Sequence, residues 1–570
     1  MTQENAAAAA RPSSIVETRA AQAFPRLSPA EVDRLSRFGE RRFFADGEPL
    51  ARVGETGHGL SIVLSGAIEI SQHDESGRRT PITTHQPGGF LGEIAQLSGR
   101  PSLIDAYARG PVETVAIAPD RLRALLVAEA EIGERIMRAL ILRRVGLIET
   151  GAGGPVIVGR EDDSDVLRLE GFLTRNGHPH LRLDPDTDAD ARALIERFHV
   201  APECLPIVLC PGGQLLRKPT DAALGRCIGL VRPIDPDRIF DVAVVGAGPA
   251  GLATAVYAAS EGLSVMVLDC RAFGGQAGAS ARIENYLGFP TGISGMALMG
   301  RAFTQAQKFG VDMAIPSEAM QLLPGEPDAP LTLSLGSGET LRTRAAVIAT
   351  GARYRRLDVP HLEDFEGSSV HYWASPLEGR LSEGQEVALV GGGNSAGQAA
   401  VYLAGRAARV TLLARRPLRD TMSAYLIERI SGLANVEVVT GAAVSALEGE
   451  GGTLEAIRWR GAADGEKRRA VRHLFLFIGA DPNTDWLLQC GLEVDERGFV
   501  HTGTRCTRER LPLETSREGV FAVGDVRSGS VKRVAASVGD GAQVVASLHA
   551  FLARQRAQPA APNVLVTASA

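Results

Sequence analysis

Two stretches of the chain share one pattern of apolar and small residues. In each, a short apolar run that indicates a buried strand leads through a glycine-rich turn into an alanine-rich segment with helical spacing. The first is DVAVVGAGPAGLATAVYAA at 241–259, and the second is EVALVGGGNSAGQAAVYLA at 386–404. A strand, a tight glycine turn and a helix in this order begin a dinucleotide-binding α/β unit. The repeat therefore predicts two such units.

The N-terminal part of the chain has a different pattern. Over 38–117 short apolar runs are broken by glycine, and the run at 60–70 is expected to form two strands joined at Ser65-Gly66. Closely spaced short strands with turn residues between them indicate a β-roll. Apolar residues then recur at helical spacing over 122–144.

Between these regions, residues 155–231 alternate strand-like and helix-like runs, which indicates a compact βαβ domain. The glycine-rich segment 151–155 looks like the linker before it. The predicted fold class is therefore α/β and multi-domain, with a β-roll, a βαβ domain and two Rossmann-like units in chain order. A length of 570 residues agrees with about four domains.

Composition narrows the class of protein. The net charge is −6, from 61 basic and 67 acidic side chains, which disfavours a nucleic-acid partner. No apolar run approaches the ~20 residues that span a bilayer, and the N-terminus has no secretory signal pattern, so a cytoplasmic protein without a membrane partner is expected. The six cysteines are too few and too scattered for a disulfide framework, and no metal site is predicted.

The first glycine turn has the features of an FAD site. Gly246 permits the tight turn, Gly248 lets the backbone approach a pyrophosphate, and Gly251 allows close packing of helix on strand. The next strand ends at Asp269, where a carboxylate would accept hydrogen bonds from a ribose.

The second turn differs at the end of its following strand. The turn carries Gly391 and Gly393, with Ala396 in the third position, but the strand ends in Arg415-Arg416 instead of an acid. Arginines at this place favour a 2′-phosphate and so predict NADPH; the alternative is that they are a solvated helix start. The residues predicted to hold NADPH are Gly391, Gly393, Asn394, Ser395, Ala396, Arg415 and Arg416.

Seven motifs over roughly 239–555 resemble the low-molecular-weight thioredoxin reductase family. They are GAGPAG (246–251), FGGQ (273–276), IENYLGFP (283–290), VIATGA (347–352), GGGNSA (391–396), FLFIGADPNT (475–484) and GVFAVGDV (519–526). The resemblance implies an FAD domain in two pieces with an NADPH domain inserted, a homodimer, and a rotation between the domains. It implies FAD contacts from Gln276 and Asn285 at the isoalloxazine, Asp525 at the ribityl chain, and also Thr350, Gly351 and Gly524.

The chain departs from this family at the redox centre. Members that reduce disulfides carry Cys-x-x-Cys and an acid before the second glycine turn, where this chain has Ala374, Ser375, Pro376, Leu377 and then Glu378. Dithiol exchange needs two sulfurs, and neither Ala nor Leu supplies one. Glu378 is kept as a candidate catalytic acid, although a solvated loop acid without that role is the favoured interpretation.

Residues 155–231 resemble a glutaredoxin or thioredoxin domain without its redox cysteines. The loop at 160–165 is acidic where that family has thiols, and Pro206 is expected to be its cis-proline. A docking domain without chemistry is the main interpretation. A surface for a peptide or an electron-accepting protein is the alternative.

Residues 38–144 resemble a cyclic-nucleotide-binding domain, through GETGHGLSIVLSGAIEI (54–70) and a cassette at 88–106. The resemblance implies that Glu93 would hold a ribose hydroxyl. The usual phosphate-binding arginine is replaced by Ser102, with Arg100 nearby as a substitute candidate. A cyclic nucleotide is therefore one candidate ligand, and a degenerate docking or dimerising module is the other interpretation.

Three functions remain open. The favoured one is an NADPH-dependent FAD oxidoreductase that passes electrons directly to an unidentified acceptor. The alternatives are a disulfide reductase that uses other thiols, such as Cys204, Cys210 and Cys227, and a non-catalytic redox or nucleotide sensor. The predicted organisation is a disordered tail (1–22), a cyclic-nucleotide-binding-like domain (23–150), a thioredoxin-like domain (155–231), an FAD domain (239–360 and 475–555), an NAD(P)H domain (361–474) and a tail (556–570).

Overall fold

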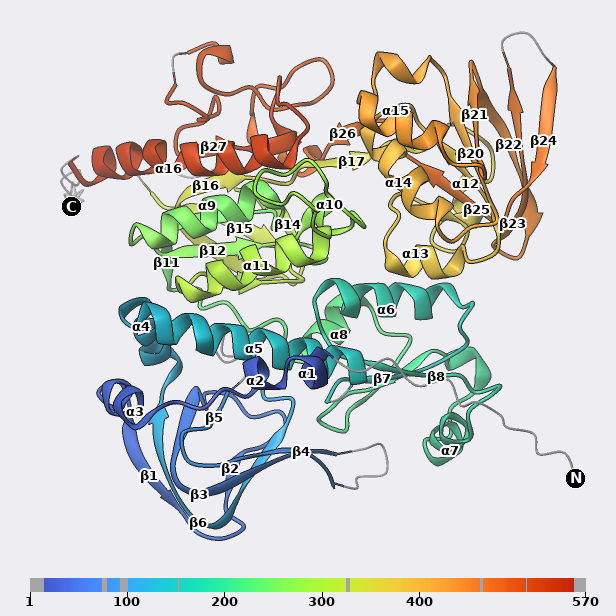
Figure 1. Cartoon of the computed structure of the whole chain (residues 1–570). Helices are drawn as coiled ribbons and strands as arrows, with labels where there is room; N and C mark the ends of the chain where they lie inside the picture. The colour runs from blue at the N-terminus through green and yellow to red at the C-terminus, as the bar shows by residue number, and fades with distance from the viewer. Residues whose placement is uncertain are drawn as a thin grey trace, which may run out of the picture. The chain divides into compact units, whose positions relative to one another are not determined.

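The computed structural model describes residues 15–73, 79–92, 101–151, 153–323, 329–461, 465–508 and 510–557. The chain divides into two compact units, Met1–Leu230 and Val231–Ala570. Figure 1 labels the elements of both units.

The first unit begins with the predicted β-roll. Its antiparallel sheet has the order β1-β6-β3-β4, with β2 paired to β6 and β5 paired to β3. Ile62 of β3, Leu125 of α4 and Ile136 of α5 are buried in one core between sheet and helices. The elements are α1 (Ile15–Thr18), α2 (Ala20–Ala23), α3 (Pro29–Ser36), β1 (Glu40–Phe44), β2 (Pro49–Ala51), β3 (Leu60–His73), β4 (Arg79–His85), β5 (Phe90–Leu91), β6 (Asp105–Ile117), α4 (Pro119–Ala128) and α5 (Ala130–Thr150).

Three predicted elements differ in the structure. The run at 60–70 belongs to one strand, β3, because the residues around Ser65 and Gly66 form bulges and not a reversal of the chain. The predicted helix 122–144 is two helices that meet at Glu129, whose carboxylate binds Arg34 and Arg37. The predicted tail 1–22 lies partly outside the described residues, and its described part contains α1 and α2.

The rest of the first unit is a four-stranded sheet of order β10-β9-β7-β8 with three helices. Strands β7 and β8 are parallel, and β9 is antiparallel to β7. The Leu205-Pro206 peptide bond is cis, which confirms that prediction. The elements are β7 (Val156–Val158), α6 (Ser164–Arg175), β8 (Leu181–Leu183), α7 (Ala189–Arg197), β9 (Ile207–Leu209), β10 (Leu215–Arg217) and α8 (Asp221–Cys227).

The second unit contains two sheet-based modules. The first module has a seven-stranded sheet of order β13-β12-β11-β16-β15-β14, with β27 paired to β16. Helix α9 packs against α11 and α16. The elements are β11 (Ile239–Val245), α9 (Pro249–Ser260), β12 (Val265–Leu268), α10 (Gly275–Gly278), α11 (Gly295–Lys308), β13 (Asp312–Ala314), β14 (Ala319–Leu322), β15 (Leu331–Leu335), β16 (Thr340–Ile348), β27 (Val520–Ala522) and α16 (Val534–Ala557).

The second module has a parallel sheet of order β18-β25-β19-β20-β21 and a separate three-stranded sheet, β22-β23-β24. A two-stranded ribbon of β17 (Ala352–Tyr354) and β26 (Ala480–Pro482) connects it to the first module. The elements are α12 (Leu362–Phe365), β18 (Val370–His371), α13 (Pro376–Leu381), β19 (Glu386–Val390), α14 (Asn394–Ala404), β20 (Arg409–Ala414), α15 (Ala424–Ser431), β21 (Val436–Thr440), β22 (Ala443–Glu450), β23 (Thr453–Arg460), β24 (Glu466–Ala470) and β25 (His473–Leu476).

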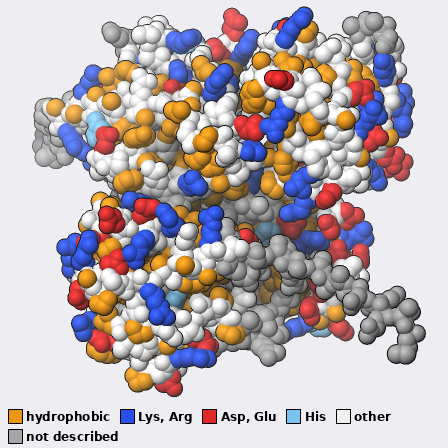
Figure 2. Space-filling model, in the orientation of Figure 1, with side chains coloured by type: hydrophobic (Ala, Val, Ile, Leu, Met, Phe, Trp, Pro, Cys, Tyr) orange, Lys and Arg blue, Asp and Glu red, His pale blue; other side chains and the backbone are white. Residues whose placement is uncertain are grey.

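Acidic and basic side chains are interspersed on the face of the molecule shown in Figure 2. This agrees with the small net charge of −6. None of the helices in the described ranges is both long and apolar enough to cross a membrane.

Candidate dinucleotide sites and the pocket between them

The three glycines of the first turn have different surroundings. A Cβ on Gly246 would lie 2.2 Å from the carbonyl oxygen of Ala349, and one on Gly251 would lie 1.8 Å from the oxygen of Gly246. The backbone of Gly248 is open: the nearest atom to its added Cβ would be the Cα of Gly275, at 3.9 Å. Two glycines are therefore needed for packing, and the third leaves room for a pyrophosphate beside the start of α9.

Asp269 stands directly after β12 and is tied to this turn. Its carboxylate accepts hydrogen bonds from the backbone N–H groups of Ala247 (2.9 Å), Arg271 (3.0 Å) and Ala272 (3.2 Å). Burial raises the pKa of Asp269, and these three donors oppose the rise. The carboxylate is thus held at the carboxyl end of the strand, where a ribose hydroxyl would meet it.

Asp525, which follows β27, has a buried oxygen that lacks a partner. Its Oδ1 makes no hydrogen bond within the described part of the chain. Burial raises the pKa of Asp525, and the nearby Lys532 ammonium opposes this. A buried acceptor without a donor is costly. A hydroxylated chain such as the ribityl chain of FAD would satisfy it, so the residues present fit FAD.

The other predicted FAD contacts lie in different surroundings: some line a pocket, some hold the backbone near the turn, and one is exposed on the surface. Gln276 lines a pocket, and its Nε2 donates to the carbonyl oxygen of Ala352. Thr350 donates through Oγ1 to the oxygen of Asn483 at 2.8 Å. Gly351 has a positive φ of 64°, and Gly524 one of 71°. Asn285 is exposed and does not line the pocket.

The second turn repeats the geometry of the first. A Cβ on Gly391 would lie 2.6 Å from the oxygen of Phe477, whereas one on Gly393 would have nothing within 4 Å. Ala396 is buried, and Asn394 accepts a hydrogen bond from the Ser423 N–H at 2.7 Å. The second turn therefore also leaves one backbone position open to a phosphate.

Arg415 and Arg416 follow β20 and are both exposed. Neither guanidinium has a hydrogen bond or ion pair among the residues that the structure describes. Two unpaired guanidinium groups at the carboxyl end of this strand fit a 2′-phosphate, and with the open turn they fit NADPH.

The segment at 374–378 forms the start of α13. The Glu378 carboxylate is 6% exposed and accepts hydrogen bonds from the Ser375 N–H (2.9 Å), the Ser375 hydroxyl and Trp373 Nε1 (2.8 Å). The expectation of a solvated loop acid is therefore wrong: Glu378 is a buried cap of the helix. It does not line the pocket.

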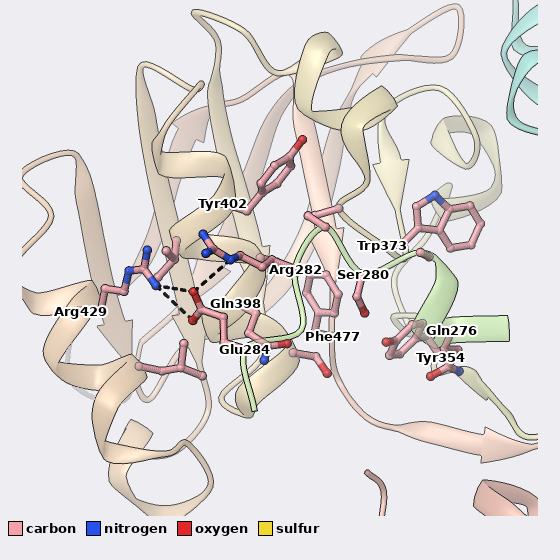
Figure 3. Close-up of a pocket in the computed structure, with 17 residues that line it drawn as sticks. Gln276, Ser280, Arg282, Glu284, Tyr354, Trp373, Gln398, Tyr402, Arg429 and Phe477 are labelled. Carbon is pink, nitrogen blue, oxygen red and sulfur yellow. Dashed lines mark hydrogen bonds and ion pairs between the residues drawn. The ribbon is translucent and has the colours of Figure 1, made fainter. Parts of the chain in front are cut away.

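A pocket of about 290 Å³ lies between the two modules of the second unit (Figure 3). Gln276, Ser280 and Tyr354 line it from the first module and the ribbon, and Trp373, Ser395 and Phe477 line it from the second. Ala374 also lines it, so the place of the missing first cysteine faces this pocket.

Tyr354 is the main pocket residue that the sequence analysis missed. Its ring meets that of Phe477 edge-on, with centroids 5.8 Å apart. Burial and the charge of Asp525 raise the pKa of Tyr354, while a hydrogen bond with Ser395 opposes the rise. The available signal was its place in the sequence, two residues after the VIATGA motif.

The candidate cyclic-nucleotide residues Glu93 and Arg100 lie outside the described residues. Ser102, at the position of the usual arginine, is buried and donates its hydroxyl to the oxygen of Ile104 at 2.8 Å. Arg143 of α5 donates to the carbonyl oxygens of Phe90 (3.0 Å) and Gly92 (3.3 Å). Burial lowers the pKa of Arg143 to about 9. This partly buried arginine holds β5, near the start of the cassette.

One disulfide is present in the first unit, although the scattered cysteines gave no sign of a framework. It joins Cys210, which follows β9, to Cys227 at the end of α8, 17 residues later. Cys204, Cys270, Cys490 and Cys506 are free. The packing of α8 beside β9 brings these two sulfurs together, which spacing alone could not predict.

Comparisons with known proteins agree with two of the three resemblances found in the sequence. Residues 240–541 match the family model described as pyridine nucleotide-disulphide oxidoreductase. Residues 41–129 match the cyclic nucleotide-binding domain. Residues 155–231 lie outside both matches.

Relatives match the same region. An alkyl hydroperoxide reductase subunit of Escherichia coli is 32% identical over 314 residues, 55% of this chain and 58% of that protein. The chain thus spans little more than half the length of that relative. Thioredoxin reductase of Bacillus subtilis is 31% identical over 319 residues, 55% of this chain and 96% of that protein.

Solved structures confirm the predicted α/β fold class. The Lactococcus lactis thioredoxin reductase, in the FR conformation, superposes with a TM-score of 0.51 at 26% identity, covering 55% of this chain and 99% of that one. The thioredoxin reductase of T. acidophilum gives the same TM-score at 29% identity, covering 55% and 99%.

Proposed function

Because the chain belongs to the pyridine nucleotide-disulphide oxidoreductase family, we propose that it takes a hydride from NADPH onto FAD and passes the electrons directly to an acceptor outside the chain. One observation carries the second half of this proposal. Ala374 and Leu377 stand where the resemblance places the two redox cysteines, and Ala374 faces the pocket between the modules. Neither side chain can form or break an S–S bond.

Each module has a defined part in this function. The open backbone at Gly248 admits a pyrophosphate, and the carboxylates of Asp269 and Asp525 accept hydrogen bonds from hydroxyl groups of FAD. Bound FAD supplies the centre that accepts a hydride and releases two electrons. The turn at 391–396 binds the pyrophosphate of NADPH, and Arg415 and Arg416 bind its 2′-phosphate.

The test is an anaerobic titration of the purified holoprotein with NADPH, followed at the flavin absorbance. We expect full bleaching at about one equivalent per flavin, because the flavin would be the sole redox centre on the path. Oxidation by added acceptors, with steady NADPH consumption, should follow. A flavin that NADPH does not bleach would contradict the proposal and favour the sensor alternative.

A second candidate function is supported by the disulfide. Reduction of Cys210–Cys227 would take two electrons and two protons and give two thiols, so this bond could receive the electrons in place of the missing pair. Cys210 is 3% exposed, whereas Cys227 is half-buried and is therefore the more accessible of the two residues.

The same titration separates the two candidates. If the disulfide is reduced, the wild-type protein needs about two equivalents of NADPH per flavin and gains two titratable thiols. A Cys210→Ser/Cys227→Ser variant would return to about one equivalent. Cys204→Ser is the matched control, because Cys204 lies in the same domain but is free. Direct transfer predicts about one equivalent for all three proteins.

We propose a cytoplasmic homodimer whose N-terminal unit regulates or docks, with a cyclic nucleotide as the candidate ligand of the β-roll. The electron acceptor is a small molecule or a redox protein. Flavin enzymes choose their acceptor through a surface that no sequence motif encodes.

A further inference from the structure

We propose that Glu284 and Arg429 are positioning residues: their ion pair holds the second module in the orientation that assembles the pocket for hydride transfer. This inference rests on the proposed function. The contact places the NADPH turn beside the flavin side of that pocket.

The ion pair joins the two modules. Nη1 of Arg429, on α15 of the second module, lies 2.9 Å and 3.1 Å from the two carboxylate oxygens of Glu284 in the first (Figure 3). Both residues line the pocket. Among the ion pairs found in the described residues, it is the one that connects these two modules.

Both ends of the pair are firmly held within their own modules. Glu284 follows Ile283, which forms a β-bridge with Ile293 through hydrogen bonds of 2.7 Å and 3.0 Å. On the other side, Leu426 and Ile430 of α15 are buried in the core of the second module. The ion pair therefore connects structured parts of the two modules, so a rotation that separates these parts breaks it.

The covalent connection between the two modules is narrow. The chain crosses between the modules only through the ribbon of β17 and β26, in which Tyr354 lies opposite Ala480. A rotation about this ribbon would separate Glu284 from Arg429 and would also move Ser395 away from Tyr354. The ion pair and the pocket therefore form in the same relative orientation of the two modules. The ion pair shifts the population of molecules toward that orientation.

Neutralising Arg429 does not leave the Glu284 carboxylate without a cationic neighbour. Arg282 Nε lies 3.6 Å from the same carboxylate, so Glu284 keeps a cationic neighbour from its own module when Arg429 is neutralised. The side chains of Arg429 and Glu284 are 47% and 23% exposed. For a pair this exposed we expect a population shift of about two- to fivefold.

The experiment compares wild type with Arg429→Gln and Arg458→Gln. Arg458 pairs with Glu448 inside the β22–β24 sheet, and the two side chains are 45% and 28% exposed, so the loss of charge is matched but does not lie between modules. Amide hydrogen exchange, measured on the flavin-containing protein without NADPH, reports how the two modules are oriented. Stopped-flow reduction of the flavin by NADPH reports how this orientation affects hydride transfer.

We expect Arg429→Gln to speed amide exchange in the pocket segments 276–284 and 395–402 and to slow flavin reduction, each by about two- to fivefold. High salt should reduce the difference between the wild type and this variant, because it screens the ion pair that only the wild type has. Arg458→Gln should match wild type. Equal effects of both variants, or no effect of Arg429→Gln on exchange, would overturn the inference. If NADPH fails to reduce the wild-type flavin, the proposed function fails, while the exchange experiment still tests the ion pair.

Discussion

An Arg415→Gln/Arg416→Gln variant is expected to lose at least about 100-fold in kcat/KM for NADPH while kcat/KM for NADH changes little. A hydrogen bond to a charged group contributes about 1.5–3 kcal/mol, and two such contacts to a 2′-phosphate would be removed. NADH lacks this phosphate, so the substitutions remove no contact that binds NADH. The measurement is steady-state kinetics with each nucleotide and one fixed acceptor.

The control for this variant is Arg472→Gln. Arg472 is an exposed arginine of the same module, but it precedes β25 and so lies at the amino ends of the parallel strands. Phosphate binding belongs to the opposite edge, at the carboxyl ends. A double variant that keeps its ratio of NADPH to NADH activity would show that Arg415 and Arg416 only form a solvated helix start.

Gly251→Ala and Gly248→Ala should separate packing from ligand binding in the first turn. Gly251 lies inside α9, where alanine by itself would stabilise a helix by about 1 kcal/mol. The added Cβ would, however, lie 1.8 Å from the oxygen of Gly246, so we expect the apoprotein to lose about 5 °C or more in Tm. Gly248→Ala adds its methyl group on the open side and should leave the Tm of the apoprotein within about 1 °C.

FAD affinity gives the complementary result. The methyl group of Gly248→Ala would occupy the space through which the pyrophosphate approaches, and we expect FAD to bind about 10- to 100-fold more weakly. Calorimetric unfolding of the apoproteins and fluorescence titration with FAD measure the two effects. If Gly248→Ala bound FAD as tightly as wild type, the pyrophosphate could not lie against this backbone.

Much of the fold could be predicted because its signals are local. The glycine turns at 246–251 and 391–396 need positive φ angles and close backbone contacts, and glycine meets these demands by itself. Errors arose where a local signal had more than one structural outcome. Ser65-Gly66 is also suited to a bulge within one long strand, and the helical spacing over 122–144 did not reveal the break at Glu129.

The site was predicted in part for the same reason. Arg415, Arg416 and Asp269 were predicted as site residues because each comes just after the strand that follows a glycine turn, and the structure has these strands. Glu378 was assigned to a solvated loop because the sequence does not show that Trp373 and Ser375 surround its carboxylate. Its burial depends on how α13 packs.

By itself, the sequence of this protein determined the two glycine turns between strand and helix, the arginines after the second, and the absence of a Cys-x-x-Cys pair. These features depend on neighbouring residues along the chain. Only the tertiary structure decided that Tyr354 lines the pocket, that Cys210 pairs with Cys227, and that Glu284 meets Arg429. Such contacts join segments that are distant in the sequence, and the packing of helices and sheets, which no single segment encodes, sets their distances.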